Sequence, residues 1–356
     1  MKIVTVVGAR PQFIKASMVS KAITKAKSIR EVLVHTGQHF DANMSDIFFH
    51  ELNLSKPDYS LGIGGGSHGQ NTGRMIEGIE QVLMKEKPNW VLVYGDTDST
   101  LAGSLAAVKL HIPVAHVEAG LRSFNRIMPE EINRVLTDHM STLLLAPTVI
   151  AKKNLNNEGI SDNKIYIVGD VMLDATIHNL HRAKKPNDFE WLDNESFSLC
   201  TFHRAENTDN LEKLLAIIEI INELAVDIPI VVPLHPRSAS AMQHLHEIKI
   251  HPNVRFINPV GFLEMAWLLK FCSLVLTDSG GIQKEAYFHG KPCVTLRDET
   301  EWVELLEIGC NQIIPPTSPN AIKKIKNFQA QIHTFGGNLY GNGFAADKIV
   351  DAIISR

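Results

Sequence analysis

Short apolar runs alternate with longer amphipathic stretches along the whole chain, and the same order occurs in both halves. In the first half the apolar runs are KIVTVV (2–7), EVLVHT (31–36), WVLVYG (90–95), PVAHVE (113–118) and TLLLAP (142–147). In the second half they are FSLCTF (197–202), PIVVPL (229–234), VRFIN (254–258), SLVLTD (273–278) and PCVTL (292–296). Nearly continuous apolar strands with helices between them indicate parallel sheets that are covered on both faces. The pattern predicts an α/β protein with two doubly wound, Rossmann-like domains.

The boundary between the halves is expected after IYIVGD (165–170), because a mixed-charge stretch with a proline, AKKPNDFEW (183–191), follows it. We therefore expect a first domain at residues 1–170 and a second at 171–342, facing each other across a cleft. A helix at 343–356 is expected to pack back on the first domain. In such sheets ligands bind outside the carboxyl ends of the strands, so polar residues at strand ends are the candidates for function.

Charge and composition exclude several classes of protein. The formal net charge is -4, which argues against a nucleic-acid binder that is held by phosphate contacts. No apolar run approaches the roughly 20 residues that cross a bilayer, and the N-terminus resembles a first strand more than a signal peptide. Four widely spaced cysteines without a CxxC pair indicate a reducing cytoplasm, and the histidines fit no common zinc spacing, so no metal is expected. No GxGxxG follows the first strand, which argues against a nicotinamide or flavin cofactor.

The stretch LTDSGGIQKEA (276–286) places two glycines where a predicted strand ends and a helix begins. Ser279, Gly280 and Gly281 would let the backbone approach a ligand, and a helix N-terminus attracts anions, most commonly phosphate. The alternative is an ordinary strand-to-helix turn with a serine cap. Glu285, one turn into the helix, could accept both hydroxyls of a ribose.

The first predicted strand also ends in a candidate anion site, within GARPQFIK. Arg10 stands at the turn, Pro11 suits a first helical position, and Lys15 lies one turn later. A surface arginine with a solvated lysine is one interpretation. The functional interpretation is a diphosphate clamp that complements the glycine turn of the second domain.

Three carboxylates follow neighbouring elements of the first half: Asp96, Glu118, and one of the pair Glu130 and Glu131. Glu130 and Glu131 open a helix and point about 100° apart, so one of them is expected to face the ligand. Asp96 could instead be a simple N-cap, and one of Glu130 and Glu131 could be an ordinary complement to the helix dipole. Carboxylates that converge in a desolvated site raise one another's pKa, which suits acid/base chemistry near neutral pH.

Two histidines follow the first two strands of the second half, His203 in TFHRAEN and His235 in PLHPR. A single strand-end histidine is often structural, but two beside a phosphate site favour ligand binding. A cationic diphosphate site, a ribose-reading acid and a separate group of carboxylates suit a nucleotide with a group attached beyond the diphosphate. A nucleotide-sugar enzyme is the simplest account.

Seven motifs make the chain similar to a known family. They are GARPQFIKA, TGQHFD, VYGDTDST, HVEAGLRS, PEEINR, TDSGGIQKEA and LYGNG. In this order, from Gly8 to Gly343, they resemble the non-hydrolysing UDP-N-acetylglucosamine (UDP-GlcNAc) 2-epimerases. The resemblance implies the two-domain fold of nucleotide-sugar glycosyltransferases called GT-B, a cytoplasmic homodimer and no external cofactor.

The resemblance also implies a mechanism. The hydrogen at C2 of the sugar is not appreciably acidic, and no nicotinamide motif is available to oxidise a neighbouring carbon, which leaves elimination of UDP to a 2-acetamidoglycal and re-addition. By similarity, the acid/base group is Asp96, Glu118 and Glu130, and His203 supports the departing diphosphate. Which carboxylate removes the proton stays open. The residues expected to bind the UDP-sugar are Arg10, Lys15, Arg134, His235, Ser279, Gly280, Gly281 and Glu285.

Three features depart from the familiar UDP-GlcNAc pattern. Trp302 stands where an arginine is usual, Gln12 replaces a usual glutamate, and the loop 38–49 differs from the glutamine-bearing loop of the allosteric site. RPQFIKA combined with EWVE is more similar to the branch that acts on UDP-2,3-diacetamido-2,3-dideoxyglucuronate for surface polysaccharide. The C6 carboxylate of that sugar would need a cation, for which Arg122 and Arg126 are candidates.

Three alternatives remain at this point. A GT-B glycosyltransferase shares the fold and the nucleotide site but has no evident use for three carboxylates in the first domain. A hydrolysing epimerase would release UDP and free N-acetylmannosamine. A catalytically silent UDP-sugar sensor would need only the UDP-binding residues, so the retention of the whole acid/base group argues against it.

Overall fold

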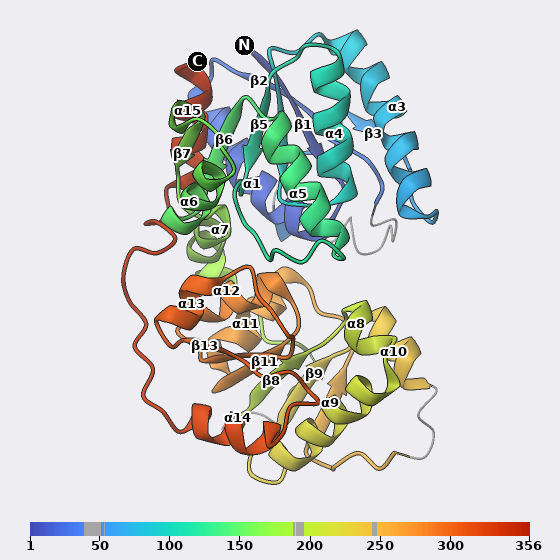
Figure 1. The fold of residues 1–356 in the computed structure, drawn as a ribbon, viewed down its shortest axis with the longest axis vertical. Helices are drawn as coiled ribbons and strands as arrows, with labels where there is room; N and C mark the ends of the chain where they lie inside the picture. The colour runs from blue at the N-terminus through green and yellow to red at the C-terminus, as the bar shows by residue number, and fades with distance from the viewer. Residues whose placement is uncertain (39–50, 53, 188, 190–195, 244–247) are drawn as a thin grey trace. The chain divides into compact units, whose positions relative to one another are not determined.

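The computed structural model describes residues 1–38, 51–52, 54–187, 189, 196–243 and 248–356. The chain divides into two compact units. Unit 1 comprises Met1–His178 and Asn338–Arg356, and unit 2 comprises Asn179–Gly337. Each unit contains one parallel sheet with helices around it, as the sequence predicts for the α/β class (Figure 1). Within the described ranges, every helix is too short or too polar to cross a membrane.

The sheet of unit 1 has seven parallel strands in the order β3-β2-β1-β4-β5-β6-β7. Their bounds are β1 Lys2–Val7, β2 Arg30–His35, β3 Tyr59–Ser60, β4 Trp90–Tyr94, β5 Val114–Val117, β6 Leu143–Ala146 and β7 Ile165–Ile167. Val4 in β1 pairs with Val32 on one side and Val91 on the other. Because both faces of the inner strands are buried, these strands are apolar almost throughout.

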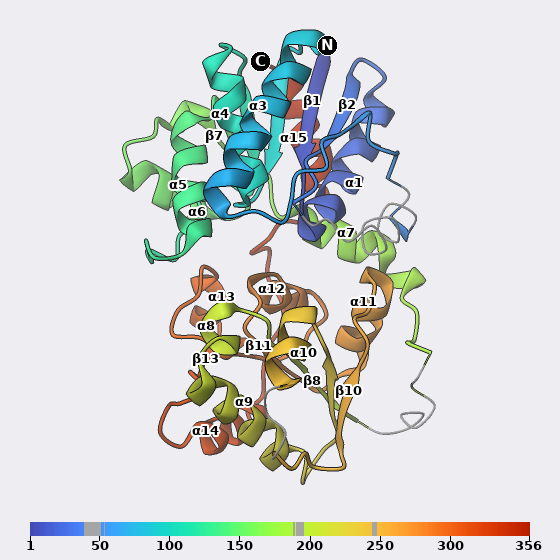
Figure 2. The same cartoon turned by 90° about the vertical axis from the view of Figure 1, so that its right-hand side faces the viewer.

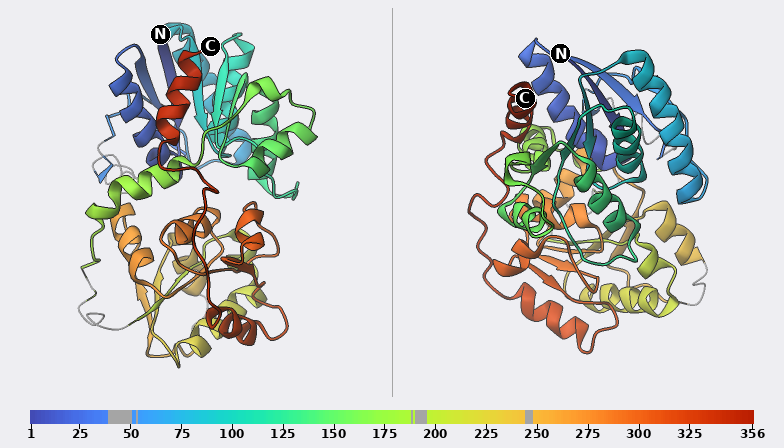
Figure 3. Two further views of the ribbon diagram at one scale, coloured as in Figure 1. Left: turned by 90° about the vertical axis from the view of Figure 1, so that its left-hand side faces the viewer. Right: turned by 45° about the horizontal axis from the view of Figure 1, so that its top comes forward.

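Helices cover both faces of this sheet. They are α1 Arg10–Ala26, α3 His68–Glu86, α4 Asp98–Lys109, α5 Pro129–Met140, α6 Val149–Asn157, α7 Val171–Asn179 and α15 Ala345–Ile354, with a 3₁₀ turn at Asp162–Lys164. Helices α3, α4 and α5 lie on one face, and α1 lies on the other (Figures 1 and 3). The C-terminal helix α15 packs directly against α1, so the end of the chain belongs to the unit that contains its beginning.

The sheet of unit 2 has six parallel strands in the order β10-β9-β8-β11-β12-β13. Its strands are β8 Ser198–Thr201, β9 Ile230–Pro233, β10 Val254–Ile257, β11 Leu274–Thr277, β12 Cys293–Thr295 and β13 Asn311–Ile313. Its helices are α8 Ala205–Thr208, α9 Leu211–Leu224, α10 Pro236–Gln243, α11 Phe262–Phe271, α12 Gly280–Phe288, α13 Val303–Glu307 and α14 Ala321–Gln329, with a 3₁₀ turn at Leu180–Arg182. Helices α9 and α14 pack together over one face of the sheet, and α11 packs over the other (Figure 2).

All ten strands predicted from apolar runs are confirmed, with ends that differ by at most one residue. Three strands were not among them: β3 with two residues, β7 with the sequence IYI, and β13 with the partly polar sequence NQI. All three lie at an edge of their sheet, where pairing with a single neighbour does not require a long, continuous apolar run. In each sheet, the helix that follows a strand begins at the carboxyl edge, and this edge carries the residues described next.

Candidate active site

The turn after β1 requires a glycine. A Cβ atom at Gly8 would overlap Oγ of Ser99 and Oγ1 of Thr36, whose hydroxyls are 2.8 Å apart in a hydrogen bond. The chain can therefore pass close to the neighbouring strand ends and start α1 at Arg10. Pro11 occupies the first turn of the helix, as the sequence predicts.

Gln12 ties this turn to the end of β4. Its Oε1 accepts hydrogen bonds from the backbone N–H groups of residues 8 and 9, at 2.7 and 3.0 Å. Its Nε2 donates to the carbonyl of Tyr94 at 2.8 Å and to the hydroxyls of Thr100 at 2.9 Å and Thr97 at 3.0 Å. The side chain is buried and uses both ends of its amide, so a carboxylate could not replace it without losing the donor half.

Lys15 on α1 forms an ion pair with Glu118, which follows β5. The two side chains are only 7% and 11% exposed. Glu118 has a φ of 71°, a left-handed conformation that disfavours a residue with a Cβ atom by roughly 1 kcal/mol or more. Backbone N–H groups of Glu118 and Ala119 donate to the carbonyl of Leu145 at 3.1 and 3.3 Å and hold the turn. A strained, ion-paired carboxylate at a strand end is a candidate for chemistry.

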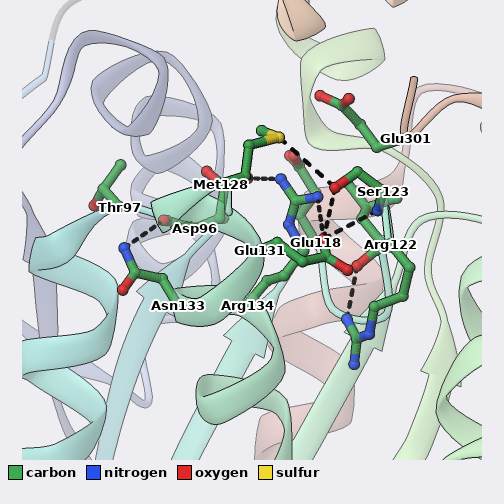
Figure 4. A network of polar contacts seen from close by, with 12 residues as sticks. Asp96, Thr97, Glu118, Arg122, Ser123, Met128, Glu131, Asn133, Arg134 and Glu301 are labelled. Atoms are coloured by element: carbon green, nitrogen blue, oxygen red, sulfur yellow. Dashed lines mark hydrogen bonds and ion pairs between the residues drawn. The ribbon is translucent and has the colours of Figure 1, made fainter. Parts of the chain in front are cut away.

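Asp96, which follows β4, contacts a second buried cation. Nη2 of Arg134 on α5 hydrogen-bonds Oδ2 of Asp96, and Nη1 of the same guanidinium lies 2.9 Å from Oε2 of Glu131 (Figure 4). The backbone N–H of Gly95 donates to the carbonyl of Val117 at 3.0 Å, so the ends of β4 and β5 are adjacent. Unit 1 therefore brings two of the predicted carboxylates to neighbouring strand ends.

Glu131 and Glu130 have different environments. Glu131 is buried, and its carboxylate accepts hydrogen bonds from the backbone N–H groups of Ser123 at 3.0 Å and Phe124 at 2.9 Å (Figure 4). It therefore closes the loop before α5. Glu130 is half-buried at the start of the same helix. Because consecutive residues of a helix point in different directions, Glu131 holds the loop while Glu130 remains partly accessible.

Sequence reasoning missed three further polar residues at this edge. Nδ2 of Asn133 donates to the carbonyl of Asp96 at 3.0 Å and to Oδ1 of Asp98 at 3.1 Å. Oδ2 of Asp98 lies 2.7 Å from Nδ1 of His68, whose ring is largely exposed. Of these residues, Asp98 could have been noted from the sequence, because it is the second aspartate of YGDTDST and lies two residues after the predicted Asp96.

Arg122 is not available to bind the C6 carboxylate of a sugar. Its guanidinium is buried, with Nε and Nη2 on the carboxylate of Glu158 at 2.6 and 2.7 Å and Nη1 on Asp138 at 2.7 Å. Burial alone would lower the pKa of Arg122, but the two carboxylates raise that pKa above its ordinary value. The candidate partner for a substrate carboxylate is thus committed to the interior, which leaves the exposed Arg126.

In unit 2 the turns after β8 and β11 are held together by Asp278. The buried carboxylate accepts hydrogen bonds from the backbone N–H groups of His203 and Arg204 and from Nδ2 of Asn207, each at 3.0 Å. The ring of His203 stacks on that of His235, with centroids 5.0 Å apart. The two predicted histidines are therefore brought together at one edge of the sheet.

The glycine turn begins α12 as predicted. A Cβ atom at Gly280 would overlap Oε1 of Glu301, whereas one at Gly281 would come no closer than 3.5 Å to Oε1 of Glu285. Ser279 is the N-cap residue of α12, but within the described chain its hydroxyl makes no capping hydrogen bond to that helix. Ser279 thus occupies the cap position without using its hydroxyl there, and the first-turn N–H groups of α12 remain suited to an anion.

Trp302, noted as a departure in the sequence, is a core residue. Its side chain is buried, and Nζ of the buried Lys284 lies 4.4 Å from the centre of its ring. Nearby, Nη1 of the buried Arg297 lies 3.1 Å from Oε2 of Glu301. An aromatic ring thus stands at this position in a buried cation–π contact. The other departure, the loop 38–49, lies outside the described residues except for Gln38, whose Oε1 accepts from Oγ of Ser99 at 2.7 Å.

An open hollow of about 500 Å³ lies along β9, β10 and the start of α10. Its lining is mainly apolar, with Arg255 and Asn258 as polar members; the other lining residues are Leu234, Pro236, Ala239, Phe256, Ile257 and Pro259. Pro236 follows the stacked His235 directly. Residues predicted to bind UDP do not line this hollow, so it adds no support to the predicted UDP site.

The predicted site residues thus lie at the carboxyl edge of one sheet or the other. Unit 1 carries Arg10, Lys15, Asp96, Glu118, Glu130 and Arg134. Unit 2 carries His203, His235, Ser279, Gly280, Gly281 and Glu285. The acid/base candidates other than His203 belong to unit 1, and the glycine turn with its ribose-reading acid belongs to unit 2.

Comparison with known proteins supports a common origin with one family. The family model described as UDP-N-acetylglucosamine 2-epimerase matches residues 21–354. The chain is 54% identical, over 99% of both sequences, to the UDP-2,3-diacetamido-2,3-dideoxy-D-glucuronate 2-epimerase of Pseudomonas aeruginosa.

Solved structures give the same result. The UDP-GlcNAc 2-epimerase of Methanocaldococcus jannaschii in complex with UDP-GlcNAc and UDP matches with a TM-score of 0.93 at 45% identity over the full length of both chains. The Neisseria meningitidis enzyme bound to UDP-GlcNAc matches with a TM-score of 0.91 at 34% identity, also over both full lengths. The two parallel sheets with their helices are therefore the GT-B-like fold of these enzymes. The chain belongs to the UDP-N-acetylglucosamine 2-epimerase family and is an epimerase.

Proposed function

We propose that the enzyme is a non-hydrolysing UDP-sugar 2-epimerase that inverts C2 of UDP-2,3-diacetamido-2,3-dideoxy-D-glucuronate for surface polysaccharide. The observation that carries the proposal is the pair of strand-end carboxylates, Asp96 and Glu118, each in contact with a buried cation. Acid/base chemistry on a sugar carbon needs carboxylates in defined positions, and a simple UDP-binding module does not. The high identity to the Pseudomonas enzyme of that name supports the choice of sugar.

The proposed reaction is an elimination followed by an addition. A carboxylate of unit 1 takes the proton from C2, the C2–H electron pair forms the C1–C2 double bond, and the C1–O bond breaks with its electrons leaving on UDP. The product pair is a bound 2-acetamidoglycal and UDP. An acid then returns a proton to the opposite face of C2 while the UDP oxygen attacks C1. Atoms and electrons balance, so no cofactor is required.

Each unit has a separate task in this scheme. Unit 2 would hold UDP as it departs, with the first-turn N–H groups of α12 and the His203 side chain near the diphosphate and Glu285 on the ribose. By similarity to the family, Arg10 and Lys15 would also be UDP-binding residues. Within unit 1, Lys15 pairs with Glu118, one of the proposed acid/base residues.

The sugar can be tested directly by deuterium incorporation. Wild-type protein in deuterated water is offered UDP-GlcNAc and the diacetamido-glucuronate nucleotide separately, and C2 is followed by NMR. Deuterium at C2 of only the acidic sugar supports the proposal. Exchange into UDP-GlcNAc alone would assign the enzyme to the other branch of the family.

The same experiment separates the rival activities. A hydrolysing epimerase would release a free sugar and UDP, which appear as separate NMR signals. A GT-B glycosyltransferase would leave C2 unexchanged in either donor, and that outcome would contradict the epimerase proposal. Arg126 remains the candidate partner for the C6 carboxylate, because Arg122 is engaged in the interior.

We further propose that the enzyme works as a homodimer in the cytoplasm, as the resemblance to its family implies. Light scattering on the purified chain measures the mass in solution. A mass of two chains of 39.6 kDa is expected, and a mass of one chain would contradict the dimer.

A further inference from the structure

Beneath the carboxylate-bearing edge of unit 1 lies a histidine that is completely buried. His116 is in the middle of β5, with 0% of its side chain exposed. Its Nε2 lies 2.7 Å from the carbonyl oxygen of Gly95, and its Nδ1 lies 2.7 Å from Oδ1 of Asp138 on α5. Both ring nitrogens thus have a close polar partner in the protein interior.

The hydrogen positions on this ring follow from the chemistry of its partners. A carbonyl oxygen only accepts hydrogen bonds, so Nε2 must carry a hydrogen and donate it to Gly95. A second proton must lie between Nδ1 and Oδ1, because two lone pairs at 2.7 Å would repel. The only choice left is whether that proton belongs to His116 or to Asp138.

The other oxygen of Asp138 decides this. Oδ2 accepts hydrogen bonds from the backbone N–H of Gly120 at 3.0 Å and from Nη1 of Arg122 at 2.7 Å, and both favour an ionised carboxylate. The proton therefore belongs to the imidazole ring.

The charges of the cluster balance when His116 is a cation. Arg122 and His116 supply two positive charges, and Asp138 and Glu158 supply two negative charges. A further ionisable neighbour is the half-exposed His139, whose Nδ1 donates to the carbonyl of Val135 at 2.9 Å and lies 3.7 Å from Oε2 of Glu158. A neutral buried cluster avoids the large cost of an isolated charge in the interior.

We infer that His116 is a buried imidazolium cation that positions the two turns carrying Asp96 and Glu118. Its Nε2 holds the carbonyl of Gly95, the residue immediately before Asp96. Its partner Asp138 holds the N–H of Gly120, two residues after Glu118. The charge state is independent of the reaction, whereas the positioning role rests on the proposed function. His116 acts through other residues and does not itself touch the sugar.

No neutral side chain of similar size reproduces these contacts. The amide of a glutamine could donate to Gly95, but its oxygen would then face the Asp138 carboxylate. A neutral imidazole has one donor for two acceptors. Gly95 and Gly120 both have positive φ values, 62° and 86°, so each turn is a tight, glycine-dependent bend that depends on such ties.

The charge state is tested on the wild-type protein by NMR of ¹⁵N-labelled histidine side chains at about pH 8, where an unperturbed imidazole is neutral. The expected result is one ring with hydrogens on both nitrogens, absent from the His116→Gln spectrum. A ring with one bare nitrogen at this position would overturn the inference. This NMR measurement needs no substrate, so its outcome does not depend on the proposed function.

The positioning role is tested by kinetics with whichever UDP-sugar the wild type turns over. His116→Gln and Asp138→Asn are expected to lower kcat about 100-fold, with KM and the affinity for UDP within twofold of wild type, because displaced carboxylates slow the chemistry. The matched control is His139→Gln on α5, which should leave kcat unchanged. Unaltered kcat in folded His116→Gln would overturn the role.

The same three variants distinguish a positioning role from a general loss of stability. General destabilisation lowers the melting temperature of all three variants and affects turnover through the folded fraction. Positioning predicts instead a lower kcat per folded molecule, measured below the melting transition, for the two variants that lose the Gly95 or Gly120 contact. If kcat falls in proportion to folded protein, the positioning role is contradicted.

Discussion

The carboxyl edges of the two sheets are built in different ways. In unit 1 the functional carboxylates contact buried cations, Asp96 with Arg134 and Glu118 with Lys15. In unit 2 the central carboxylate, Asp278, gathers backbone and amide N–H groups from the neighbouring turn. The functional carboxylates of unit 1 are thus held by cations, whereas Asp278 of unit 2 is held mainly by neutral hydrogen-bond donors.

The difference follows the chemistry assigned to each edge. A residue that exchanges a proton must be held in one place and surrounded by charges that set its protonation. An edge that binds an anion needs close backbone approach, which the glycines of the α12 turn provide because they lack side chains. Glu118 shows the cost of the first arrangement, because it adopts a φ of 71° that Gly280 does not require.

The strongest expected effect is on turnover through Glu118. Glu118→Gln keeps the size of the side chain but removes its charge and its ability to take a proton, so turnover should fall about 10³-fold. UDP affinity in calorimetry should stay within a fewfold, since the glycine turn belongs to unit 2. The exposed Glu77→Gln on α3 is the control and should turn over normally. Normal turnover in Glu118→Gln would remove this residue from the acid/base group.

The next effect is on stability, at the shared cation of unit 1. Arg134→Met leaves Asp96 and Glu131 buried or half-buried without their cation, which should lower the free energy of unfolding by about 3 kcal/mol. Denaturant unfolding measures the change. Lys25→Met removes a solvent-exposed ion pair with Asp347 and should leave stability unchanged. Equal midpoints for the two variants would show that charge pairing does not organise this edge.

A smaller effect is expected on the stability of unit 2 as the pH falls. Burial, followed by the positive charges of Lys291 and Lys270, lowers the pKa of His289 at the end of α12 to about 4. Because the unfolded pKa is about 6.5, the unfolded chain binds the proton first as the pH falls. The stabilising effect is therefore fully present above about pH 6.5 and is lost progressively down to about pH 4, with about 2 kcal/mol lost at pH 5.

His289→Gln tests this pH dependence. Urea unfolding at about pH 7 and pH 5 is followed by tryptophan fluorescence, to which Trp267 and Trp302 of unit 2 contribute. The wild type should lose more stability than the variant between the two pH values. Identical losses in both proteins would contradict a neutral, half-buried His289.

The strands could be predicted from sequence because burial on both faces forces an apolar run in each. The edge strands Tyr59–Ser60, Ile165–Ile167 and Asn311–Ile313 could not, since each has only two or three residues and pairs with a single neighbour. The strand ends also identified the site candidates, because parallel strands bring their carboxyl ends to one edge.

The hydrogen bonds and ion pairs beneath the site could not be predicted from the sequence. His116 lies within an apolar run, and nothing local shows that its partners are Asp138 on a later helix and the carbonyl of Gly95 on the neighbouring strand. The same holds for Arg122, whose motif suggested a ligand contact but whose partners are in the interior. Such pairs depend on long-range packing, which motif spacing does not encode.

The smallest expected effect compares the two adjacent glycines of the α12 turn. Gly281→Ala adds a methyl group with no contact closer than 3.5 Å in the free protein, so stability should be unchanged. UDP affinity should nevertheless fall about tenfold if the diphosphate approaches this backbone as closely as proposed. Gly280→Ala should lower UDP affinity and also melting temperature, because its methyl displaces the Glu301 carboxylate from Arg297. Calorimetry and thermal unfolding separate the two variants. Wild-type UDP affinity in both would mean that the glycine turn of unit 2 is not the anion site, and the contrast with unit 1 would lose its functional meaning.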